Sequence, residues 1–451
     1  MTKREGYSPT TAVLLIAGIV FAAFAEAVAS TVLSVARLDL IGDVHATPDE
    51  YAWLDVSYVA LKFIGFMAAP GLLANINPRR VVIAATLVMG ASSGLAATIA
   101  NLDALVALRA VQGLTGGILL VGGQSILFLA FPRSRQPVVQ TLFAIGSVVA
   151  PATIAPAFQG WLVDNRSWTW IFFSILPVAL ASAGILLSAE DTNPIRLIRR
   201  NYDWLGLGLV SIPLLCFTFV LSQGNRWDWF EDQRIMLVTV LGVISSLAFF
   251  SQQALSKSRR LLELAMFQSD QFSFAFLVSF IAGAALFGSA YLIPAFATSV
   301  LAFTPTDAGL LLLPSGAFFV AALCFAAFLF QIVRIPPIAT APFGIIMIMT
   351  AMWMLSGSTR DSGAFDMMTA ILVRGVGLGF LFLSITLIAF SDLGERALAS
   401  GIGLFNLGRQ AGGLVGVATL QTLIDHKIAA NTAILGESLS PGSVMLDERL
   451  N

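Results

Sequence analysis

The residues that could do chemistry in this chain are charged side chains inside long apolar runs. Four of them interrupt stretches long enough to cross a hydrocarbon core of ~30 Å, namely Glu26, Asp55, Lys62 and Arg109. A charge at that depth costs at least ~2.5 kcal/mol, so it normally faces protein or a water-filled cavity. These side chains are the first candidates for carrying protons or binding a charged solute.

Glu26 lies in the middle of the first apolar run. A carboxyl group removed from water holds its proton at a higher pH than one in water, as a proton carrier near neutral pH requires. We therefore expect Glu26 to bind and release protons. The alternative is that Glu26 only forms an ion pair with a basic residue.

Asp55 and Lys62 are seven residues apart, which places them two turns apart on one face of a helix. A buried lysine either pairs with a carboxylate or loses its proton. We expect Lys62 to face the same cavity as Glu26 and to be its partner. The alternative is that Lys62 extends toward the membrane interface, where its charge reaches water.

Arg109 allows three interpretations: a fixed counter-charge to a nearby carboxylate, a contact for an anionic substrate, or a brace for backbone carbonyls. The first two are functional and are favoured by the rarity of idle charge inside membranes. Gln112 and the glycines Gly113 and Gly117 are predicted to pack, because small residues spaced by four let helices approach closely.

The composition identifies an integral membrane protein. Of the 451 residues, 57% are hydrophobic and 11% are charged, whereas soluble domains carry about 25% charged residues. The net charge of -1 argues against a nucleic-acid partner. Cys216 and Cys324 lie in apolar runs without metal-ligand spacing, and no nucleophile or phosphate-binding motif is present. We therefore expect no metal, no cofactor and no enzymatic activity.

Hydropathy predicts an all-α polytopic protein with about thirteen spans. The expected ranges are 12–36, 52–74, 80–100, 104–131, 138–163, 168–188, 204–222, 234–254, 272–298, 306–332, 337–356, 366–391 and 397–424. Three regions follow from them: a six-helix bundle over 1–190, an inserted helix pair with its connectors over 191–265, and a second bundle of five spans with a polar tail over 266–451.

Basic residues predict the orientation. Fourteen lie in loops on the N-terminal side of the membrane and five in loops on the other side. Because cytoplasmic loops carry the excess of lysine and arginine, the N-terminus is expected in the cytoplasm of a multi-pass inner-membrane protein. A weak internal repeat, 108–113 echoed by 373–378, falls at equivalent spans of two pseudo-symmetric halves.

With these residues in view, the chain resembles the major facilitator superfamily and, within it, the fourteen-span drug:proton antiporter family. Arg109, Gln112 and Gly113 match the fourth-span motif of that superfamily, while the segments 203–206 and 223–227 resemble the marks of the two inserted spans. The resemblance implies two helix bundles of the major facilitator type that work by alternating access.

A cytoplasmic loop after the second span is similar to the signature of the same superfamily. Gly71, Asn75, Arg79 and Arg80 belong to it, with Asn75 where an aspartate is usual. The resemblance implies a gate loop that latches the two halves. Simple anchoring of the loop by its arginines on the cytoplasmic side explains them equally well.

The fifth span carries Pro151, Pro156 and Gly160, which resemble the glycine-proline motif of exporters. Prolines remove helix hydrogen bonds and bend the helix, so this span is expected to act as a hinge or a seal. The alternative is that these prolines have no special role, since proline is frequent in membrane helices.

The second half contributes Arg374, Asn406 and Arg409 as its polar points, and 401–416 is similar to the family's thirteenth span. Asn406 and Arg409 are three residues apart and share a helix face. Arg409 is expected near the cytoplasmic end, where it would brace the inner gate.

The resemblance implies proton-coupled efflux of amphipathic drugs or small molecules. In the family, a first-span aspartate stands where this chain has Ala29, so Glu26, one turn earlier, is expected to take its role. The expected partners are a small-molecule substrate, protons, the bilayer and a periplasmic adaptor protein. Two alternatives stay open: transport of a specific, anionic metabolite, and a truncated, non-transporting membrane protein, because no fourteenth apolar run is found.

Overall fold

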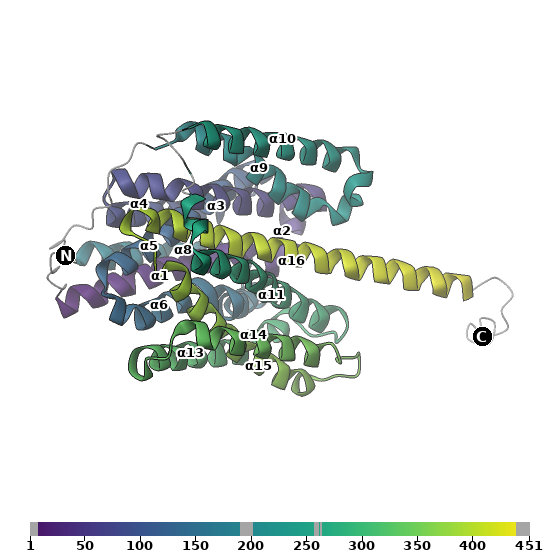
Figure 1. The fold of residues 1–451 in the computed structure, drawn as a ribbon. Coiled ribbons are helices and arrows are strands. Elements are labelled where there is room, and N and C mark those ends of the chain that lie inside the picture. The colour runs from purple at the N-terminus through teal and green to yellow at the C-terminus, as the bar shows by residue number, and fades with distance from the viewer. Residues whose placement is uncertain (1–7, 190–201, 257–260, 262–263, 439–451) are drawn as a thin grey trace.

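The computed structural model describes residues 8–189, 202–256, 261 and 264–438, and every regular element within them is a helix (Figure 1). Within these ranges, twelve helical segments are long and apolar enough to cross a membrane. They coincide with the first twelve expected spans. The expected all-α polytopic architecture is therefore confirmed.

The first half is a bundle of six spans. Side chains cap the starts of several of its helices: Thr47 and Glu50 form a reciprocal capping box, and Asn77 and Asn101 cap the next two spans. The elements are α1 (Pro9–Val35), α2 (Arg37–Val44), α3 (Pro48–Asn75), α4 (Pro78–Ala96), α5 (Leu102–Ala130), η1 (Arg133–Arg135), α6 (Gln136–Ala144), η2 (Ile145–Ile154), α7 (Ala155–Asn165) and α8 (Thr169–Ser188).

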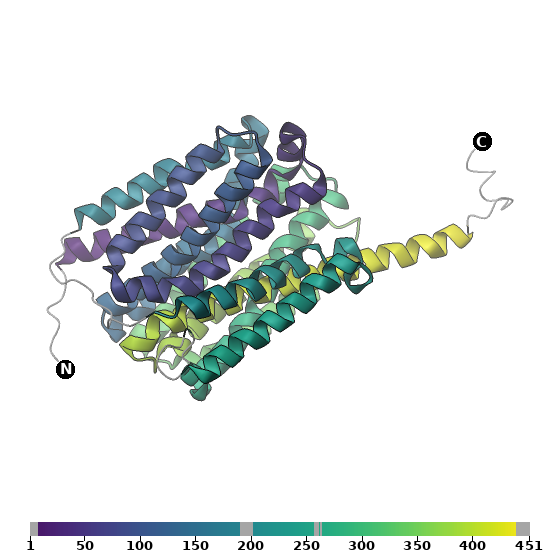
Figure 2. The same ribbon diagram turned by 90° about the horizontal axis from the view of Figure 1, so that it is seen from above.

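The inserted pair consists of α9 (Trp204–Gln223) and α10 (Gln233–Leu255), joined by η3 (Asn225–Trp227) and η4 (Trp229–Glu231). The two helices pack on each other, and α9 also packs on α3 (Figure 2). Most of α10 is exposed, including Leu237, Ile244 and Leu247, as expected for a helix that faces lipid. The connector before the pair lies largely outside the described residues, so the predicted division at 190 and 265 stays a prediction.

The second half repeats the helical arrangement with fewer spans. Its elements are η5 (Leu264–Gln268), α11 (Asp270–Ser299), α12 (Pro305–Leu310), α13 (Leu313–Phe328), η6 (Leu329–Val333), α14 (Pro337–Leu355), α15 (Ala364–Phe390) and α16 (Glu395–Ser438). The helix α15 packs on α11, α13 and α14, much as α5 packs on α1, α3 and α4 in the first half.

The helix α16 contains the thirteenth expected span, 397–424, but is not among the twelve membrane-length apolar segments. It packs on α11 within its own half and on α3 and α5 of the first half. Its last turns run past Leu423 and project from the bundle (Figures 1 and 2). The polar region after 424, expected only as a tail, is thus helical as far as Ser438.

Candidate functional site

Glycines on α5 position the charged residues of the first half. A side chain at Gly113 would overlap the backbone carbonyl of Tyr58, and one at Gly117 would overlap that of Lys62. The two glycines and the two carbonyls are each four residues apart, so α3 and α5 meet along one full turn. This close packing holds the side chains of Tyr58 and Lys62 in the core beside α1.

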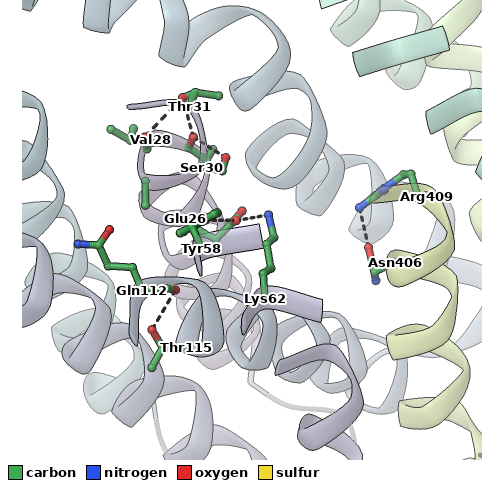
Figure 3. Close-up of polar contacts among 12 residues, drawn as sticks. Glu26, Val28, Ser30, Thr31, Tyr58, Lys62, Gln112, Thr115, Asn406 and Arg409 are labelled. Atoms are coloured by element: carbon green, nitrogen blue, oxygen red, sulfur yellow. Dashed lines mark hydrogen bonds and ion pairs between the residues drawn. The ribbon is translucent and has the colours of Figure 1, made fainter. Parts of the chain in front are cut away.

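Glu26 of α1 is buried, with 1% of its surface exposed. Its Oε1 accepts a hydrogen bond of 2.8 Å from the Tyr58 hydroxyl and forms an ion pair with the Lys62 ammonium (Figure 3). A Cβ atom at Gly116 would lie 3.1 Å from Glu26 Cγ, so the glycine makes room for this side chain. The partnership that the sequence favoured for Lys62 is present.

Arg109 is fully buried and acts as a brace in this conformation. One guanidinium nitrogen, Nη1, donates to the Ala29 carbonyl at 2.8 Å and to Gln112 Oε1 at 2.9 Å. The guanidinium carbon lies 4.0 Å from the ring centroid of Tyr58, a cation–π contact. Arg109 therefore reaches Glu26 through Tyr58, and it contacts α1 at the Ala29 carbonyl.

Three donors beside this brace have no hydrogen-bond partner among the described residues: Arg109 Nε, Arg109 Nη2 and Gln112 Nε2. Buried polar groups are normally paired, so unpaired donors at one place indicate a region that can receive an acceptor. Asp55 lies one turn before Tyr58, is half-buried, and interacts electrostatically with Arg109 and Lys62. The structure brings these side chains together in one region, as expected from the sequence.

The second half adds Arg409 and Asn406 of α16. Arg409 Nη2 donates to Asn406 Oδ1 at 2.6 Å, and Asn406 Nδ2 donates to Gln124 Oε1 of α5 at 3.0 Å, which links the two halves. Arg409 also interacts electrostatically with Glu26 and with Lys62, toward which it points in Figure 3.

The position of Arg409 along its span bears on its predicted role. It was expected near the cytoplasmic end, and α16 begins at Glu395, two residues before the expected span and fourteen before Arg409. At 1.5 Å per residue this is about 21 Å of helix. Its guanidinium is buried and interacts electrostatically with Glu26 and Lys62, and its place relative to the membrane surface stays a prediction.

Arg374 of α15 is fully buried, like Arg109, but has only neutral partners. Its Nε donates to Ser289 Oγ at 2.7 Å, its Nη1 to Ser315 Oγ at 3.2 Å, and its Nη2 to the Leu286 carbonyl at 3.3 Å. These contacts join α11, α13 and α15. In the described part of the chain no carboxylate pairs with it.

The first turn of α4 binds the end of α8, and the residues expected in a gate loop lie instead in the adjoining ends of α3 and α4. Arg79 Nε donates to the Leu186 carbonyl at 2.8 Å, and its Nη2 reaches the Ala189 carbonyl. A cation at the carboxyl end of a helix stabilises its unpaired carbonyls. Gly71 lies against the Tyr202 ring, and Asn75 donates to the Gly71 carbonyl at 2.9 Å. Arg80 is exposed.

The fifth span passes through a π-helical segment. Pro151 lies inside η2 and Pro156 follows it in α7, and both lie within one continuous helical span, Arg133–Asn165. Thr153 of η2 contacts Gly316 of α13, so the π-helical segment meets the second half. Gly160 is buried one turn later in α7, next to Gln159, whose amide donates to the Val28 carbonyl at 2.8 Å.

Comparisons with known proteins agree with this architecture. The family profile described as "Major Facilitator Superfamily" matches residues 17–417. The chain is 26% identical over 449 residues to "Colistin resistance protein EmrB" of Acinetobacter baumannii, covering 98% of this chain and 86% of that protein. It is 24% identical over 444 residues to "Multidrug export protein EmrB" of Escherichia coli K12, with the same coverage.

Two further similarities concern function and fold. The "Fatty acid resistance protein FarB" of Neisseria gonorrhoeae is 25% identical over 427 residues, covering 95% of this chain and 83% of that protein. The crystal structure of the human organic anion transporter MFSD10 superposes with a TM-score of 0.61 at 12% identity, covering 92% of this chain and 94% of that chain. The similarity to MFSD10 shows a shared fold alone.

Proposed function

Because this chain belongs to the Major Facilitator Superfamily, we propose that it exports amphipathic small molecules through the inner membrane in exchange for protons. Its similarity over nearly the full chain to the multidrug export protein of Escherichia coli supports export. The buried Glu26 supports proton coupling. The excess of basic residues in loops on the N-terminal side supports a cytoplasmic N-terminus.

The observation that carries the proposal is the Glu26–Lys62 ion pair. Among the described residues of the two bundles, Glu26 is the carboxylate with almost no exposed surface; the buried Asp203 caps α9 instead. Protonation removes the negative charge and with it the attraction that joins α1 to α3. A buried ion pair that loses one charge leaves the other uncompensated, which is strongly unfavourable. Loading a proton therefore changes which arrangement of α1, α3 and α16 is stable.

Arg109 and Tyr58 transmit this change in the proposed mechanism. Tyr58 donates to Glu26 and presents its ring to Arg109, while Arg109 holds α1 at the Ala29 carbonyl. Movement of Glu26 thus acts on the same helix that Arg109 braces. The hydrogen bond between Asn406 and Gln124 joins the two halves, so a movement in the first half would reach the second half through it.

An adaptor protein is the proposed partner outside the bundle. The end of α16 projects beyond the helical core with Ile428 and Ile434 exposed. It is held near its exit from the bundle by Trp229, whose Nε1 donates to Thr422 Oγ1 at 3.1 Å. Under the predicted orientation this projecting helix lies on the periplasmic side.

Proton coupling is tested in inside-out membrane vesicles that maintain a proton gradient. Adding transported amphipathic compounds should dissipate the gradient with the wild-type protein and leave it unchanged with Glu26→Gln. The matched control is Asp103→Asn, which removes an exposed carboxylate at the start of α5 and should behave as wild type. Equal dissipation by Glu26→Gln and wild type would reject Glu26 as the proton carrier.

A further inference from the structure

Lys62 occupies the place beside Glu26 that a cationic substrate would need. The Glu26 Oε1 atom already receives the Lys62 ammonium and the Tyr58 hydroxyl. The backbone of α5 at Gly116 closes the space next to Glu26 Cγ. An ammonium group on a ligand could reach this carboxylate oxygen only by displacing a lysine that is anchored to α3.

The surrounding charges also oppose a cation. In the described part of the two bundles, Glu26 is the one fully buried carboxylate, and Asp49 and Asp55 are half-buried. The buried cations are Lys62, Arg109, Arg374 and Arg409. Because Arg409 interacts with both members of the ion pair, a positive ligand between the halves meets repulsion from both sides.

The unpaired donors beside Arg109 favour an acceptor on the ligand. Arg109 Nε, Arg109 Nη2 and Gln112 Nε2 are hydrogen-bond donors without a partner in the described residues. Donors of this kind bind carboxylate, carbonyl or hydroxyl oxygens and cannot bind an ammonium group. One unpaired acceptor, Gln159 Oε1, also lies against α1, but it is neutral, so the charged groups of the site favour a ligand without positive charge.

We propose that Lys62 is a built-in cation that determines specificity: it excludes positively charged amphipaths, so the site takes amphipaths that carry no positive charge. This inference rests on the proposed function and narrows its substrate class. Lys62 acts as a specificity residue by filling the site for a cation. Removing its ammonium should therefore open the Glu26 carboxylate to cationic ligands, which is a gain of binding.

Binding to the purified protein tests this directly. The probes are ethidium, an aromatic cation, and 11-(dansylamino)undecanoate, a fluorescent amphipathic carboxylate, measured by fluorescence titration. Wild type should bind the carboxylate and bind ethidium at least roughly tenfold more weakly, a gap of ~1.4 kcal/mol. Lys62→Met should gain ethidium binding by a similar factor. Lys62→Arg keeps the positive charge and should not gain it.

Two further variants keep the test decisive. The double variant Glu26→Gln with Lys62→Met should lose the gained ethidium binding, because the carboxylate that attracts the cation is gone. Thermal melting of each variant shows that it is folded. If wild type binds ethidium as well as Lys62→Met does, or if neither probe binds any folded variant, the proposal is overturned.

The same proteins separate this inference from the proposed function. Reconstitution into proton-loaded vesicles measures coupled transport of the carboxylate probe. Selective binding without proton-coupled transport would uphold Lys62 as the specificity residue and reject the exporter mechanism. Proton-coupled transport of ethidium by the wild type would uphold the exporter mechanism and reject Lys62 as the specificity residue.

Discussion

The two halves of the molecule place an arginine in the same setting and surround it with different chemistry. Arg109 on α5 and Arg374 on α15 both donate to a carbonyl of the first helix of their half, Ala29 or Leu286. Beside Arg109 lie a carboxylate, a lysine and a tyrosine, whereas Arg374 binds two serine hydroxyls. The comparison indicates that a buried arginine is common to both halves, whereas the ionisable neighbours lie in the first half.

The glycines that shape these sites are also matched. Gly113 and Gly117 of α5 face the carbonyls of Tyr58 and Lys62, while Gly375 and Gly379 of α15 face those of Ser315 and Phe319. In both halves the glycines are four residues apart and let a helix pair approach to backbone contact. The shared packing explains why the two arginines are held at comparable places although their neighbours differ.

The largest expected effect is a loss of folded protein when a closely packed glycine of either half is replaced. Gly113→Val or Gly375→Val inserts a side chain against a backbone carbonyl, and overpacking of this kind costs ~1–3 kcal/mol or more. Both variants should give little folded protein by fluorescence-detected size exclusion. The control is Gly184→Val, where nothing lies within 4 Å of the added Cβ, and it should fold normally. Survival of Gly113→Val would show that the close packing of α3 and α5 is dispensable.

The next effect is expected to differ between the two halves. Arg109→Gln should reduce proton-coupled transport at least about tenfold, equivalent to ~1.4 kcal/mol of barrier, because it removes the brace on α1 and the contact with Tyr58. Arg374→Gln should lower thermal stability, since lost hydrogen bonds to buried groups cost ~1–3 kcal/mol, and should keep protons and substrate coupled. Loss of coupling in both variants would place proton chemistry in both halves.

A smaller change isolates the hydroxyl next to Glu26. Tyr58→Phe keeps the ring that faces Arg109 and removes the 2.8 Å hydrogen bond to Glu26. Because Lys62 still pairs with Glu26, we expect the net loss of a typical hydrogen bond, ~0.5–1.5 kcal/mol, so coupled transport should fall severalfold in proteoliposomes. Tyr51→Phe removes a hydroxyl that donates to the Leu33 carbonyl on the same helix pair and should transport normally. Identical behaviour of the two variants would deny the hydroxyl a role.

The smallest effect concerns the contact between the halves. Asn406→Ala and Gln124→Ala each break the 3.0 Å bond that joins α16 to α5, and such a bond contributes ~0.5–1.5 kcal/mol. Each variant should change the transport rate a fewfold, and the double variant should be no worse than either single one. Additive losses would mean that the two side chains act separately.

Much of this arrangement was predictable because membrane insertion penalises charge. Long apolar runs located twelve spans, and the cost of buried charge singled out Glu26, Lys62 and Arg109 as neighbours. Tyr58 could not be singled out in this way, since a tyrosine inside an apolar run costs little and carries no comparable signal. Its importance comes from the register of α3 on α5, which the glycines set.

Other features depend on how helices meet. The charged neighbours of Arg409, Glu26 and Lys62, depend on how α16 docks on the first half, which a sequence pattern does not give. The bond between Asn406 and Gln124 joins positions 282 residues apart, so it depends on the docking of the two halves. The binding of Arg79 to the end of α8 likewise requires the three-dimensional arrangement, because the sequence explains the arginine equally well as an anchor.

The central claim is that Glu26 is the group in the membrane that gains and loses a proton. Infrared difference spectroscopy of the purified protein between acidic and alkaline pH measures this directly, because a protonated carboxyl group has a carbonyl band that the ionised form lacks. Wild type, Asp103→Asn and Arg374→Gln should show the band of a carboxyl group in apolar surroundings, and Glu26→Gln should lose it. An unchanged band in Glu26→Gln would contradict the account.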